Sequence, residues 1–310
     1  MTIVEPMTQS TVDPVPDPTK PRPALLWLAL VVIGIGWGIT GPLSKLAVST
    51  GNHPIGVTFW ETVIGAVVVT AILLASGRRL PLDRRHLVFF LICGFLGTAL
   101  PISLSYTAYQ HLPIGVIAIS IALVPMATLL LALPLGIERP ELQRLAGLGL
   151  GVVAVGLIVL PEASLPEPGQ AAWVALPVIV SLAYAAENIY IAIARPPGCG
   201  ALTVICGLSW GALILLTPAL VAAGAWVDIA RLGPPEQAII ASSALHMGAY
   251  FGFIWLIGQA GPVFAAQVAY VVTGSGVILG MIVYAERHSP WIWAALALMF
   301  AGLALVKPQR

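Results

Sequence analysis

Four ionisable side chains lie inside long apolar stretches of this sequence, where charges are otherwise rare. Lys45 and Glu61 belong to the first two stretches, Glu187 to the sixth and His246 to the eighth. A charged group inside a bilayer is costly unless it has a partner or faces water, so such residues usually mark a transport path or a proton relay. We therefore take these four residues as the first candidates for a substrate or proton site.

Lys45 and Glu61 are expected to form an ion pair. Lys45 lies near the end of the first apolar stretch and Glu61 about six residues into the second, so two antiparallel helices bring them to similar depths. The pair is either structural or opens when a substrate or proton arrives. The alternative is a Lys45 side chain that extends to the lipid headgroups without pairing.

Glu187 is expected to bind and release protons. Its own helix has no lysine or arginine one turn away, and Arg195 is two turns away. A carboxyl group without a cationic partner in a low-dielectric interior favours its protonated form. Tyr184 and Asn188 are close in sequence, and at least Tyr184 shares its helix face. The alternative is a protonated carboxyl group that hydrogen-bonds to a neighbouring helix.

His246 belongs to a polar stripe near the middle of the eighth stretch. Tyr250 lies one turn below it, and Ser242 and Ser243 lie one turn above. If the stripe faces a cavity, it can hydrogen-bond a substrate. A neutral histidine bonded to a neighbouring backbone is equally compatible with the sequence.

Three further residues complete the candidate set for substrate or proton binding. Gln267 and Tyr270 form a polar pair at three-residue spacing in the ninth stretch. Trp37 falls deep within the first stretch, away from the headgroup level that tryptophans prefer, and is expected to pack inside.

The sequence offers no motif for an enzyme or for a cofactor. Cys93, Cys199 and Cys206 match no metal or redox spacing, and we find no nucleophile elbow, ATP-binding motif or metal-ligand cluster. A net charge of +1 argues against a nucleic-acid partner. We expect no metal, no cofactor and no enzymatic activity.

The composition is that of a membrane protein. Only 9% of the 310 residues are charged and 59% are hydrophobic, whereas a soluble domain carries roughly 25% charged residues. A helix needs about 20 apolar residues to cross the hydrocarbon. Ten such stretches are predicted, roughly at 25–47, 55–76, 87–108, 114–137, 141–160, 171–194, 201–224, 237–258, 262–284 and 290–306.

The loops predict the orientation in the membrane. With a cytoplasmic N-terminus, most loop lysines and arginines fall inside and only Arg231 and Arg287 fall outside, which follows the positive-inside rule. Residues 1–23 contain acidic residues and six prolines but no apolar core, so they are expected to form a disordered cytoplasmic tail and not a signal peptide. Both termini are predicted to be cytoplasmic.

The chain also contains a repeat of about half its length. A long apolar stretch ends at Glu138-Arg139, and another ends at Glu286-Arg287. Five helices per copy is an odd number, so the second copy enters the membrane from the opposite side. We predict an all-α protein with two inverted five-helix repeats over residues 24–162 and 163–310. The two acidic-basic pairs either latch a gate across the halves or form solvated turns.

An ordered set of motifs over residues 25–306 is similar to a known family. It comprises Trp37-Gly38 followed by Lys45, the segment from Tyr106 to Tyr109, Glu138-Arg139 before a glycine-rich helix, and Glu286-Arg287 before Gly302. The set resembles the EamA family of the drug/metabolite transporter superfamily. The resemblance implies ten helices in two inverted repeats, a central cavity, and export of small metabolites such as amino acids.

These observations lead to one leading hypothesis and two alternatives. The leading one is a secondary transporter in the cell (inner) membrane that exports a small polar or amphipathic metabolite by alternating access, coupled to protons through Glu61 or Glu187. The alternatives are an uncoupled facilitator of another metabolite class and a membrane scaffold or assembly protein. The expected partners are the small-molecule substrate and the lipid bilayer, and both monomer and homodimer remain open.

Overall fold

The computed structural model describes residues 23–137, 141–160, 165, 167, 169–266 and 268–305. Within these ranges every regular element is a helix. Seven helical segments are long and apolar enough to cross a membrane, so the chain is a multi-pass membrane protein. Almost all of the predicted N-terminal tail lies outside the described residues, as do Glu138 and Arg139.

The first half of the chain forms α1 to α7, and most bounds agree with the apolar stretches. The bounds are α1 (Pro23–Val48), α2 (Pro54–Ala75), α3 (Arg84–Gly94), the π-helical turn η1 (Phe95–Ala99), α4 (Leu100–His111), α5 (Ile114–Ile121), α6 (Val124–Ala132) and α7 (Leu142–Val159). The segments α3, η1 and α4 follow one another directly and form one span. The Asp83 side chain begins this span by accepting hydrogen bonds from the backbone of Arg85 and His86.

The second half forms η2 to α12. The bounds are the 3₁₀ turn η2 (Gln170–Val174), α8 (Ala175–Ala194), α9 (Ala201–Ala222), the 3₁₀ turn η3 (Ile229–Arg231), α10 (Pro234–Ala266), α11 (Val268–Tyr284) and α12 (Pro290–Leu305).

Two stretches differ from the sequence prediction. The fourth stretch is interrupted near Ala122, and α6 begins next to Pro125, which cannot donate a backbone hydrogen bond but is well tolerated in a first helical turn. The eighth helix continues past the loop expected at 259–261 and ends at Ala266. No charged residue lies between Glu236 and Glu286, and the helix runs through Gly261 and Pro262, where the loop was expected.

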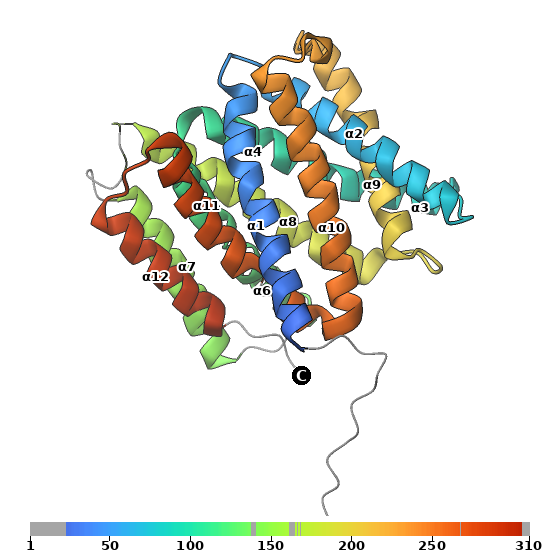
Figure 1. Cartoon of the computed structure of the whole chain (residues 1–310). Coiled ribbons are helices and arrows are strands. Elements are labelled where there is room, and N and C mark those ends of the chain that lie inside the picture. The colour runs from blue at the N-terminus through green and yellow to red at the C-terminus, as the bar shows by residue number, and fades with distance from the viewer. Residues whose placement is uncertain are drawn as a thin grey trace, which may run out of the picture.

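The helices pack into a bundle in which α1 occupies a central place (Figure 1). α1 packs along α10 and α11, while α7 and α12 form a pair at one side of the bundle. α9 packs against both α2 and α3, and α8 packs against α4 and α6. Helices from the two halves therefore alternate through the bundle.

The crossing of α3 and α9 depends on small residues. A Cβ atom on Gly94 would overlap the backbone of Leu208 and Ala212, and one on Gly211 would overlap the carbonyl of Phe90. Glycines at both positions let the two backbones touch, as is common where membrane helices cross closely.

Candidate functional site

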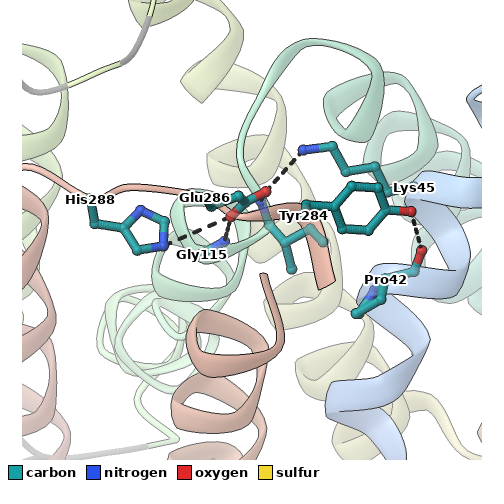
Figure 2. Close-up of polar contacts among 7 residues, drawn as sticks. Pro42, Lys45, Gly115, Tyr284, Glu286 and His288 are labelled. Carbon is teal, nitrogen blue, oxygen red and sulfur yellow. Dashed lines mark hydrogen bonds and ion pairs between the residues drawn. The ribbon is translucent and has the colours of Figure 1, made fainter. Parts of the chain in front are cut away.

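The carboxylate of Glu286 is the centre of a polar cluster that joins the two halves of the chain (Figure 2). Lys45 Nζ donates to Glu286 Oε1 at 2.9 Å. The backbone amide of Ile114 donates to the same oxygen at 2.8 Å, and that of Gly115 donates to Oε2 at 3.3 Å. These amides belong to the N-terminus of α5, where the helix dipole also favours a negative charge. The His288 ring lies on the far side, with Nε2 3.8 Å from Oε2.

The loop between α11 and α12 is shaped to hold Glu286 in this place. Ala285 adopts a left-handed backbone conformation with φ of 52°, and the Glu286 amide bonds to the carbonyl of Gly280 at 3.3 Å. Cβ atoms at Gly115 and Gly280 would overlap His288 and Glu286 respectively, so both glycines make room for the cluster. Only 7% of the Glu286 side chain is exposed, against 25% of Lys45.

Tyr284 supports the same cluster from α11. Its hydroxyl donates to the carbonyl of Pro42 at 3.0 Å, and Lys45 Nζ lies 5.1 Å above the centre of its ring. The lysine is thus held between a carboxylate and an aromatic face.

The expected ion pair between Lys45 and Glu61 is wrong. Lys45 turns to Glu286, which is 241 positions away in sequence, and Glu61 has other partners. Tyr106 donates its hydroxyl to Glu61 Oε2 at 2.7 Å, and Ser242 donates to Oε1 at 3.4 Å. Glu61 is half-buried, while Tyr106 and Ser242 are fully buried. The carboxylate therefore connects α2, α4 and α10.

An aromatic group lies between α1 and α10. The ring centre of Trp37 is 6.1 Å from those of both His246 and Tyr250, and 5.4 Å from that of Phe253. His246 and Tyr250 stack on one another, as expected for residues one turn apart. The structure thus brings three of the candidate residues together.

Glu187 lies against the π-helical turn η1. A Cβ atom on Gly97 would overlap its carboxylate, so this glycine provides the space that Glu187 fills. Within the described residues Glu187 has no ion pair or hydrogen-bond partner.

The remaining candidates lie elsewhere or outside the described residues. Asn188 is exposed on α8, and Arg287 is exposed beside the Glu286 cluster. Tyr270 packs on Phe300 of α12, away from the aromatic group around Trp37. Gln267 and the Glu138-Arg139 pair lie outside the described residues.

A cavity of about 570 Å³ opens beside Glu286. Its lining includes Lys45, Tyr109 and Glu286. His111 and Trp173 also line it, and their rings stack with centres 3.6 Å apart. The cavity therefore has room for a small solute beside the Glu286 cluster.

The sequence interpretation missed His288 and Tyr284 as members of the site. A histidine two positions after Glu286 and a tyrosine two positions before it were the available signals, since short loops keep such residues near one another. Tyr106 belonged to a family motif but carried no assigned partner. Among the described residues, no group of three or more histidine, cysteine or acidic side chains could hold a metal ion.

Comparisons with known proteins agree with this architecture. The uncharacterized inner membrane transporter YedA of Escherichia coli (strain K12) is 25% identical over 295 residues, which cover 91% of this chain and 90% of YedA. YedA of the O157:H7 strain matches to the same extent. A protein solved by crystallography is 17% identical, with a TM-score of 0.62 over 91% of this chain and 96% of that one, and it shares the fold.

The family comparison is confined to the first half of the chain. Residues 23–160 match the EamA-like transporter family, the part that contains Trp37, Lys45, Glu61 and Tyr106. This agrees with the resemblance carried by the sequence motifs. Over residues 23–160 the chain is therefore similar to the EamA-like transporter family.

Proposed function

We propose that this protein is a secondary transporter that carries a small polar or amphipathic metabolite, such as an amino acid, across the cytoplasmic membrane. The observation that carries the proposal is the Glu61 group, in which a carboxylate, a tyrosine and a serine from three helices meet inside an apolar bundle. Buried polar groups of this kind are expensive in a membrane and are usually retained for function. The likeness to YedA, an inner membrane transporter by name, supports the same conclusion.

Alternating access between two inverted five-helix repeats is the proposed mechanism. The helix packing supports it: α1 packs on α10 and α11 of the second half, and α8 packs on α4 and α6 of the first. The pairs α2–α9, α5–α11 and α7–α12 each join counterparts of the two proposed repeats. Repeats related by a two-fold axis in the membrane plane are expected to make such matching contacts, in which each helix packs on helices of the other repeat.

The Glu286 cluster is the proposed gate at one end of the path. It joins α1 and α5 of the first half to the α11–α12 loop of the second, so opening that end requires the contact to break. With both termini cytoplasmic, as the loop charges predict, this end faces outward. Export then requires the cluster to open after the substrate has entered from the cytoplasm.

Proton coupling is proposed to depend on Glu187. It is a membrane carboxyl group with no ion pair or hydrogen-bond partner among the described residues. Protonation would remove a charge from the bundle without breaking an ion pair. An uncoupled facilitator is the second candidate, favoured if Glu187 only fills the space beside Gly97.

Flux through purified protein in liposomes tests the proposal. Labelled amino acids are supplied as a mixed pool, with and without a pH gradient. We expect flux that follows the gradient and is lost in Glu187→Gln, while the exposed control Asp228→Asn keeps wild-type flux. Gradient-independent flux would leave an uncoupled facilitator, and absence of flux for every amino acid would contradict this substrate class.

A further inference from the structure

Donor groups from two separate segments of the chain converge on one carboxylate from a third segment, at the proposed gate. Lys45 Nζ and the Ile114 amide reach Oε1 of Glu286, and the Gly115 amide reaches Oε2. The lysine comes from α1 and the amides from the N-terminus of α5, while the acceptor comes from the α11–α12 loop. The donors therefore belong to parts of the chain other than the loop that supplies their acceptor.

His288 is the second indication of a binding site. Its side chain is only 2% exposed, and Nε2 is buried with no hydrogen-bond partner. The ring points at Glu286 Oε2 but stays 3.8 Å from it (Figure 2). A buried, unsatisfied ring nitrogen is unfavourable, and a ligand slightly displaced from the Glu286 position would satisfy it.

The distribution of donors favours a carboxylate over a spherical anion. Lys45 Nζ and the Ile114 amide both donate to Oε1 of Glu286. The Gly115 amide donates to Oε2, and the His288 ring nitrogen lies 3.8 Å from Oε2. A planar group with two oxygens matches this division, and Lys45 supplies the opposite charge. The neighbouring cavity of about 570 Å³ leaves room for the rest of a small molecule.

We propose that Lys45, the α5 N-terminus and His288 form a carboxylate-binding site, which Glu286 occupies in this conformation and which takes the carboxylate of a small metabolite when the α11–α12 loop withdraws. Opening of the gate would then replace the carboxylate of Glu286 by the carboxylate of the metabolite at the same donors. The statement that the bound carboxylate belongs to a transported substrate rests on the proposed function, whereas the site itself does not.

Chemical rescue tests the site without any measurement of transport. Glu286→Ala leaves the donors without their acceptor, so its thermal midpoint in detergent should fall. Added sodium formate or acetate should raise that midpoint saturably, and the wild-type protein should not respond. Sodium chloride at equal ionic strength should have a much smaller effect. Equal effects of acetate and chloride, or a folded variant with no response, would overturn the proposal.

A double variant identifies the donors that bind the added anion. Lys45→Ala combined with Glu286→Ala should weaken the apparent acetate affinity at least tenfold. If Glu286→Ala does not fold, Glu286→Ser serves the same test, because its short side chain also leaves the position of the carboxylate empty and Lys45 without a counter-charge. Acetate affinity that is unchanged by loss of Lys45 would also contradict the site.

Flux separates the two proposals from each other. An amino acid should compete for wild-type transport at least tenfold better than the amine that lacks its carboxylate. Anion rescue without any flux would retain the site and reject the transport function. Flux without anion rescue, and with equal competition by the amine, would retain transport and reject the site.

Discussion

The carboxylate of Glu61 accepts hydrogen bonds from Tyr106 and Ser242, so one side chain connects α2, α4 and α10. Glu61→Gln keeps the size of the side chain but removes the negative charge to which the Tyr106 and Ser242 hydroxyl groups donate. A hydrogen bond to a charged group contributes about 1.5–3 kcal/mol, so we expect flux to fall by about tenfold or more. Liposome flux of the variant provides the measurement.

Thermal unfolding separates this effect from a general loss of structure. Glu61→Gln should stay within about 2 kcal/mol of the wild-type stability, because the amide can still accept one of the two hydrogen bonds. Asp228→Asn, an exposed charge-neutralising change, is the matched control. Unaltered flux together with unaltered stability in Glu61→Gln would remove Glu61 from the substrate path.

His288 is expected to make the stability of the folded protein depend on pH. Burial lowers the pKa of His288 below its ordinary value of 6.5, with Glu286 opposing this shift and Lys45 adding to it. The unfolded chain therefore binds a proton at a higher pH than the folded chain does. The stability of the folded protein should fall as the pH drops from 6.5 toward the lower, folded-state pKa.

Replacement of His288 should remove that part of the pH dependence. We expect His288→Gln to lose less stability than wild type between pH 7 and pH 5, measured as thermal midpoints in detergent at several pH values. The same slope in both proteins would show that the His288 ring titrates normally in the fold.

At the scale of the helices, the crossing of α3 and α9 requires Gly94 and Gly211. We expect Gly94→Ala to lower stability by about 1–3 kcal/mol, because the added methyl group meets backbone atoms that cannot move aside. Gly248→Ala on α10 is the matched control, since nothing lies within 4 Å of its Cβ position. That change should be neutral or stabilising by roughly 0.5–1 kcal/mol, because alanine favours a helix. Chemical denaturation checks both variants, and equal effects would contradict the tight crossing.

At the scale of the whole molecule, α1 begins and α12 ends at the same end of the bundle (Figure 1). The loop charges predict that this end faces the cytoplasm. Alkaline phosphatase fused after Arg310 should therefore be inactive, and the same reporter inserted at Asp228 should be active. A fluorescent protein at Arg310 should fluoresce as the reciprocal control. Active phosphatase at Arg310 would reverse the orientation and with it the direction assigned to the gate.

Much of the helical architecture could be predicted from the sequence, because long apolar stretches allow few alternatives in a membrane. The bounds of α1, α2, α8 and α9 fall within a few residues of the predicted ones. The break near Ala122 lies beside Pro125, whose missing backbone donor is a local signal. The extension of α10 to Ala266 was not predicted, because Gly261 and Pro262 favoured a loop there.

The residues of the site were easier to predict than their partners. Lys45, Glu61 and His246 stood out because polar groups are rare in these stretches. Lys45 was assigned to the nearest carboxylate in sequence, yet it pairs with Glu286 at the far end of the chain. The pairing of Lys45 with Glu286 depends on how the two halves pack, and it cannot be predicted from residue spacing within one helix.

The π-helical turn η1 has a consequence for the register of the span that contains it. Such a turn usually arises from one inserted residue, and each residue of an α-helix advances its face by about 100°. The turn therefore determines which side of α4 presents Tyr106 to Glu61, and it also contains Gly97, against which Glu187 packs. Deletion of one residue within 95–99 should leave the span apolar and membrane-inserted but turn Tyr106 away from its acceptor. This deletion would leave the hydropathy of the span almost unaltered. It would nevertheless remove the contact of Glu61 with Tyr106 and the contact of Glu187 with Gly97.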